Sequence, residues 1–152
     1  MKPYILFLTG LIFIDQSSYA QREASNWYFG ANAGVSFNNG TPVALTGGQM
    51  NQGEGVATIS DANGNLLFYT DGATIWNRTH AVMQGGTGLN GDGLSSQSGV
   101  IVPMPNSPNI YYVFTVSNWP KTGAGAGLFY SIVDMNLDNG NGGVTLKNDL
   151  LN

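Results

Sequence analysis

The 152-residue sequence contains no cysteine. Disulfide bonds, thiolate zinc sites and cysteine nucleophiles are therefore excluded, and sheet or helix packing has to stabilise the fold. Charged residues are also scarce, at 9% of the chain, with 5 Lys and Arg against 9 Asp and Glu. Because no basic cluster is present to hold phosphates, we expect no nucleic acid partner.

The sequence also lacks the 3.6-residue apolar period of an amphipathic helix over any long window. It has instead 22 glycines and many short runs of β-branched and aromatic residues separated by Gly-Asn turns. Such runs fit a pleated, half-buried surface. The composition therefore predicts an all-β fold made of short strands.

The first 20 residues have the features of a secretory signal. Lys2 provides a positive start, residues 4–14 are mostly apolar, and small residues precede Ala20. The apolar run is too short for a bilayer, which takes roughly 20 residues. We therefore expect a signal peptide over residues 1–20 that is cleaved after Ala20, with no membrane span left in the mature chain. An uncleaved anchor is the alternative.

The segment from Gly55 to Asp71 is the most strongly patterned part of the chain. Strands are expected near 55–60 and 66–71, because the Asn63-Gly64 pair between them is a strong hairpin signal. Oxygen side chains at alternate positions of this turn also resemble the start of a calcium loop. The twelfth position of such a loop is Gly72 where a bidentate Glu is needed, so we expect a plain turn and no metal site.

A partial repeat of this hairpin indicates the architecture. A shift of about 44 residues places Gly99 on Gly55 and Tyr112 on Phe68. Each hairpin is followed by two further short apolar segments, so each unit has four strands, the size of one blade of a β-propeller. The further segments are 74–76 and 81–83 after the first hairpin, and 128–135 and 144–146 after the second.

We therefore predict a partial β-propeller of the WD40-like or quinoprotein-like kind within residues 21–152. It has about three consecutive antiparallel blades, over about residues 26–48, 55–84 and 99–148, of which the first is atypical. Known propeller rings contain at least about four blades. The expected form is thus a truncated ring, the fragment of a longer chain with further blades.

Several strings together suggest a family. The region from about 26 to 150 resembles the start of the N-terminal propeller in large secreted surface proteins of Gram-negative bacteria that use type IX secretion, the gliding-motility-associated class with a C-terminal sorting domain. The resemblance implies downstream immunoglobulin-like modules and export to the cell surface. It transfers no catalytic motif. The strings that carry it are NWYFG, EGVATISDANGNLLFYTDGATIWNR, SSQSGVIVPMPNSPNIYYVFTV and LFYSIVDMNLDNG.

The first functional hypothesis is a secreted or cell-surface module that binds a glycan, a peptide or another protein. Its candidate contact residues are polar or aromatic groups at strand ends or in loops. Two of them precede the first strand of a blade, which lies near the central channel in propellers. The six candidates are Glu54, Trp76, Arg78, His80, Gln97 and Trp119. The aromatic run Trp27-Tyr28-Phe29 is expected to pack between sheets instead.

The alternative hypotheses are an enzyme and a structural spacer. Propellers also host glycosidases and lyases, and the acidic residues least explained by turns are Glu54, Asp71 and Asp92. His80 is the only histidine and has no nucleophile elbow nearby. We therefore assign no catalytic residue and no cofactor to this chain, and a propeller enzyme would keep its catalytic residues largely elsewhere. The glycine-rich stretch 85–93 is expected to connect two blades.

Overall fold

The computed structural model describes residues 22–117 and 126–151. The expected all-β class is confirmed, with 47% of the residues in strands and 5% in helix. The predicted signal peptide and Trp119 lie outside the described residues. No helix in the described part is long and apolar enough to cross a membrane. The elements are η1 (Arg22–Ala24), β1 (Asn26–Phe29), β2 (Ala33–Ser36), β3 (Val43–Leu45), β4 (Ala57–Ser60), β5 (Leu66–Thr70), β6 (Thr74–Asn77), β7 (Val82–Thr87), β8 (Gly99–Pro103), β9 (Ile110–Val116), β10 (Leu128–Asp134), η2 (Asp138–Gly140) and β11 (Gly143–Leu150).

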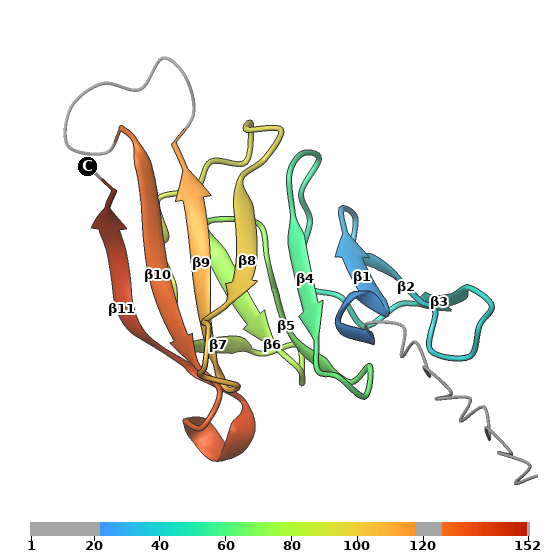
Figure 1. Cartoon of the computed structure of the whole chain (residues 1–152). Helices are drawn as coiled ribbons and strands as arrows, with labels where there is room; N and C mark the ends of the chain where they lie inside the picture. Colours follow the sequence, from blue (N-terminus) through green and yellow to red (C-terminus); the bar gives the residue numbers. More distant parts are fainter. Residues whose placement is uncertain (1–21, 118–125, 152) are drawn as a thin grey trace, which may run out of the picture.

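The strands form two sheets (Figure 1). β1, β2 and β3 form a three-stranded antiparallel sheet. The other eight form one sheet in the order β4-β5-β6-β7-β11-β10-β9-β8, which contains two antiparallel units, the first meander (β4–β7) and the second meander (β8–β11). This sheet is nearly closed, and its end strands β4 and β8 are in contact.

The two predicted hairpin units are thus present, but they are not separate sheets. The first meander joins the second at its outer edge through one parallel pairing, Gly143 with Gln84. Gly85, at φ +71°, brings the backbone close to Val144 and extends β7 into the stretch that the sequence assigned to a loop. Next to this seam, Lys147 Nζ donates to the carbonyl of Thr87 at 2.8 Å.

The turn of the first hairpin has the predicted form. Asp61 Oδ1 accepts hydrogen bonds from the backbone N–H groups of Asn63 and Asn65, both at 2.9 Å. Gly64 has a φ of +84°, in the left-handed region that glycine adopts most easily. Partial burial alone raises the pKa of the Asp61 carboxyl, but the hydrogen bonds from Asn65 and Asn63 and the charge of Arg78 together hold this pKa below its usual value. The Asp61 carboxylate therefore fixes the turn.

The packing buries both faces of the first meander. Between the two meanders lies the larger core, where the Phe68 and Tyr111 rings meet edge to face at 5.6 Å. On its other face, the first meander packs against the three-stranded sheet through Tyr28, Met50 and Tyr69. The second meander is covered by the first on one face only. We call its other face the forward face; it carries Val100, Val102, Tyr112, Phe114, Leu128, Tyr130, Ile132 and Leu146.

Asn26 connects the three-stranded sheet to the first hairpin. Its buried Nδ2 donates to the Ser60 hydroxyl at 2.9 Å and to the Gly64 carbonyl at 2.7 Å. We expect Asn26→Leu to lower the free energy of unfolding by about 2–3 kcal/mol, because both buried acceptors lose a donor. Urea denaturation measures this loss. The exposed Asn51→Leu is the control, and equal losses in the two variants would contradict the assigned connection.

Candidate functional site

A groove of about 470 Å³ runs along the first strands. β1, β4 and β8 each pair with a single neighbour in the described sheets, on one side only. β4 contacts both β1 and β8, so three strand edges lie next to one another along this groove. We call it the first-strand groove. Its lining consists of Trp27, Tyr28, Phe29, Val56, Ala57, Thr58, Gln97, Gly99, Val100 and Ile101.

Thr58 holds β4 beside β1 without a backbone ladder. Its hydroxyl accepts a hydrogen bond from the Tyr28 N–H at 2.9 Å and donates to the Tyr28 carbonyl at 3.4 Å. A side chain between two strands keeps their backbones further apart than the roughly 4.8 Å of a paired sheet. Ala57 adds only a methyl group to the lining, whereas Gly99 is buried against Gly72 and Thr70. The groove therefore follows these strand edges, with the Tyr28 backbone groups bonded to Thr58.

β1 supplies the aromatic part of the groove. Its residues alternate, so that Tyr28 is 5% exposed whereas Trp27 is 53% and Phe29 is 42% exposed. The expected core packing is therefore correct for Tyr28 and wrong for its two neighbours, because successive side chains of a strand point to opposite faces. The Trp27 indole is fixed by a hydrogen bond from Nε1 to the Ala24 carbonyl at 2.8 Å. The groove lining has no charged side chain among the described residues.

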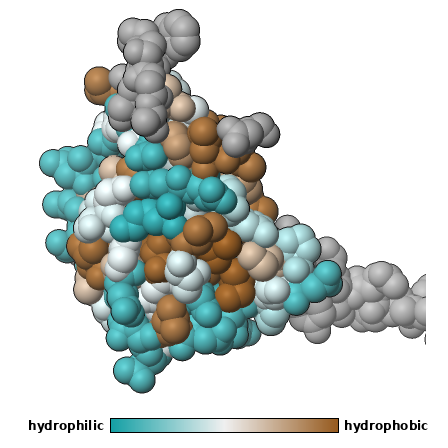
Figure 2. Space-filling model, turned by 90° about the vertical axis from the view of Figure 1, so that its left-hand side faces the viewer, coloured by the Kyte–Doolittle hydropathy of each residue, from teal (hydrophilic) through white to brown (hydrophobic). Residues whose placement is uncertain are grey.

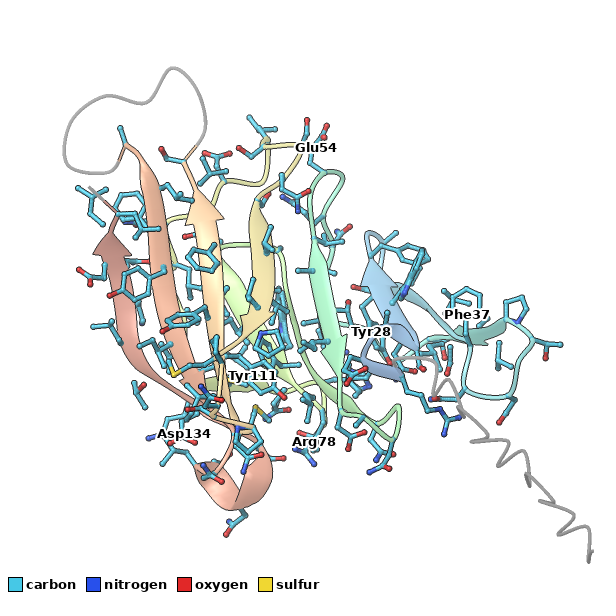
Figure 3. All side chains as sticks on the ribbon, in the orientation of Figure 1. Tyr28, Phe37, Glu54, Arg78, Tyr111 and Asp134 are labelled. Carbon is cyan, nitrogen blue, oxygen red and sulfur yellow. The ribbon has the colours of Figure 1, made fainter. Side chains whose placement is uncertain are left out.

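Two of the predicted contact residues lie at one end of the first strands. Gln97 lines the groove, and its Nε2 donates to the Gly99 carbonyl at 3.0 Å. Glu54 is exposed just before β4 and lies at the opposite end of the molecule from Arg78 (Figure 3). Glu54 does not line the groove. Of the five candidates that lie within the described residues, only Gln97 is thus part of this site.

Trp76 and His80 lie together in a different place, between the three-stranded sheet and the first meander. Tyr69 stacks on Tyr28 with ring centroids 4.7 Å apart and on Trp76 at 5.5 Å. Its hydroxyl lies 3.2 Å from Nδ1 of His80 and accepts from the Gln49 N–H at 3.1 Å. Burial raises the pKa of the Tyr69 hydroxyl, although the Gln49 hydrogen bond opposes this, so the group stays protonated at neutral pH. The packing assigns Trp76 and His80 to the interface between the sheets.

Arg78 lies at the other end of the molecule, in the turn after β6. It lines a second hollow of about 530 Å³ together with Glu23, Asp61 and Tyr111. Burial and the nearby charges of Asp61 and Glu23 raise the pKa of Tyr111. Charged side chains of both signs therefore gather here, away from the first-strand groove.

The remaining acidic candidates have structural roles in turns. Asp71 Oδ1 accepts from the N–H groups of Ala73 at 2.9 Å and Thr74 at 2.7 Å. Asp92 Oδ1 accepts from the Leu94 N–H at 2.9 Å. The expectation that turns explain these residues poorly is thus wrong. No group of three or more His, Asp or Glu side chains that could hold a metal is found among residues 22–117 and 126–151.

Comparison of the chain with protein-family models, with curated proteins and with solved structures finds no match. The site is therefore interpreted from its own geometry. Sequence reasoning did not select the exposed aromatic pair of β1 or the small residue Ala57. The available signal was the two-residue alternation in NWYF, which leaves every second side chain on the uncovered face of a strand.

Proposed function

We propose that this chain is part of a secreted or cell-surface binding module of the β-propeller class, and that its first-strand groove binds an extended peptide. Three consecutive antiparallel units pack face to face, with their first strands adjacent, which supports the propeller assignment. The signal-like residues 1–20 support export. The observation that carries the binding proposal is the groove along three strand edges.

A peptide fits this groove for two physical reasons. An extended peptide binds a free sheet edge through main-chain hydrogen bonds, and adjacent pockets for its side chains add specificity. Here the edges of β4 and β8 provide the main-chain groups, because the Tyr28 N–H and carbonyl at the β1 edge are already bonded to Thr58. The exposed Trp27 and Phe29 rings provide apolar contact area. The uncharged lining favours apolar or neutral polar side chains over acidic or basic ones.

A glycan is the second candidate ligand, and one specific observation favours it. The exposed Trp27 ring and the Gln97 amide line the same groove. An aromatic ring offers an apolar surface to a ligand, and an amide both donates and accepts hydrogen bonds. This combination suits a ligand with apolar faces and many hydroxyl groups.

Filling the groove tests the proposal. Parent protein is used to select from a phage-displayed library of randomised linear peptides and is applied in parallel to a glycan array. Ala57→Arg places a long charged side chain in the groove, so we expect the selected peptides to bind this variant at least roughly tenfold more weakly. The control is Thr41→Arg, in the exposed loop before β3, which should bind as the parent does. Thermal unfolding verifies that both variants are folded.

The outcomes separate the candidates. Peptides that bind parent and Ala57→Arg equally well, or a selection that enriches no peptide, would contradict the peptide proposal. Glycan binding that Ala57→Arg abolishes would assign the groove to the second candidate. A Gln97→Ala variant, which removes one amide from the lining, is expected to weaken binding of either ligand less than Ala57→Arg does, because it leaves the groove open.

A further inference from the structure

The three antiparallel units stack in one direction, and each has two faces. Paired residues of neighbouring strands share a face, so the register assigns every side chain. In the three-stranded sheet, Tyr28 points toward the first meander, whereas Trp27 and its partner Val35 point away. We call this outer side the back face. Phe37, labelled in Figure 3, belongs to it, because its ring meets the Trp27 ring at 5.6 Å.

The same kind of junction occurs twice within the chain. At the first junction, Tyr28 of one unit stacks on Tyr69 of the next. At the second, Phe68 meets Tyr111 of the second meander edge to face. In each case the forward side of one unit covers the back side of the following unit with aromatic and aliphatic residues. The repeat shows that the units stack in the same direction. Phe68 and Tyr112 align in the repeat, and each lies on the forward side of its own unit.

Two faces of this kind remain uncovered within the described residues, one at each end of the stack. On the forward face, the rings of Tyr112, Phe114 and Tyr130 form a cluster with centroids 5.8–6.4 Å apart. On the back face, Trp27, Phe29 and Phe37 are 53%, 42% and 41% exposed. Apolar surface also extends to the side where β11 lies, in patches divided by hydrophilic residues (Figure 2). Exposed apolar patches of this kind mark interaction sites.

We propose that a second copy of this chain docks head to tail, with the forward face of one copy covering the back face of the other. The argument is continuity, because the forward and back faces carry the chemistry that already meets at both internal junctions. The aromatic and aliphatic residues named on the two faces are uncharged, as expected in the centre of an interface. Asp149, which pairs with Tyr130 and accepts a hydrogen bond from its hydroxyl, adds one charge to the forward face. The contact is heterologous, joining two different patches, so it either closes a ring or extends. A copy docked on the back face would also cover Trp27 and Phe29, which line the first-strand groove, so assembly and peptide binding compete for these two rings.

Two charge substitutions test the direction of docking. Phe114→Lys disables the forward face and Phe37→Lys disables the back face, and neither residue lines the first-strand groove. Sedimentation of the full chain over a concentration series should show assembly of the parent. Each variant alone is expected to associate roughly 100-fold more weakly, because an apolar contact becomes a buried unpaired charge. The control is Thr41→Lys, which should assemble as the parent does, and thermal melts establish that all variants are folded.

Mixing the two variants is the decisive measurement. In the mixture, the intact forward face of Phe37→Lys can bind the intact back face of Phe114→Lys. A head-to-tail contact therefore predicts a one-to-one complex that neither variant forms alone. Assembly of Phe37→Lys by itself would show a contact between two forward faces and would overturn the proposal. A parent that stays monomeric at all concentrations, or a mixture of folded variants that stays monomeric, would overturn it as well and assign these faces to another partner.

Discussion

Replacing Phe68 with alanine is expected to lower the free energy of unfolding by about 3–5 kcal/mol, the range for truncating a buried aromatic side chain. Phe68 is completely buried between the two meanders and contacts Tyr111 there. Removing the ring leaves a cavity lined by residues from both halves of the eight-stranded sheet. Urea denaturation with extrapolation to water measures the loss, which is a large part of the stability of a small domain.

The matched control for this substitution is Tyr112→Ala. Tyr112 aligns with Phe68 in the repeat but lies on the forward face, where no other unit of the described chain covers it. We expect a smaller loss in dilute protein, about 1–2 kcal/mol, since the Tyr112 ring is only half-buried. Losses of similar size in the two variants would contradict the assignment of one covered and one uncovered face.

The second large effect is expected for Gly72→Ala. Gly72 has a φ of +86°, and an added Cβ would lie 2.5 Å from the Ser98 carbonyl oxygen. The substitution therefore combines a strained backbone conformation with a clash against backbone at the junction between the meanders. We expect a loss of about 3–4 kcal/mol, from the sum of a left-handed conformation and overpacking. Thermal or urea unfolding measures it.

Gly88→Ala separates the two causes. Gly88 has a similar φ of +72°, but an added Cβ would have no atom within 4 Å. Its loss should be limited to the backbone cost, about 1 kcal/mol. If Gly72→Ala were no more destabilising than Gly88→Ala, the close approach of Ser98 to Gly72 would not contribute to stability, and the proposed packing of this junction would be wrong.

Much of the fold could be predicted from local patterns. The Asn63-Gly64 turn and the apolar runs on either side were sufficient to place β4 and β5, because turn chemistry and two-residue alternation act over a few residues. The repeat then located β8 and β9. The strand β7 was expected to end near Met83 but extends to Thr87. Gly85 and Gly86 resemble a loop locally, and only the approach of β11 makes them part of a sheet.

The candidate site was harder to predict, because it depends on which units lie side by side. Its position at a strand end predicts Trp76 as a ligand contact, and only the structure shows that it also stacks on Tyr69. Trp27 seemed part of the core, yet the three-stranded sheet leaves its outer side open. Both differences follow from contacts between residues distant in sequence. Local propensity cannot indicate such contacts.

The pairing of Gly143 with Gln84 has a mechanical consequence. Every other junction in the eight-stranded sheet has at least two residue pairs, and most have three or more, whereas this one has a single pair. A pulling force across the outer edge would be borne there by one rung and a few side-chain bonds to residues 87–90. The outer edge is therefore the weakest junction of the sheet under force. We expect the two meanders to separate there first, while the core between them stays packed.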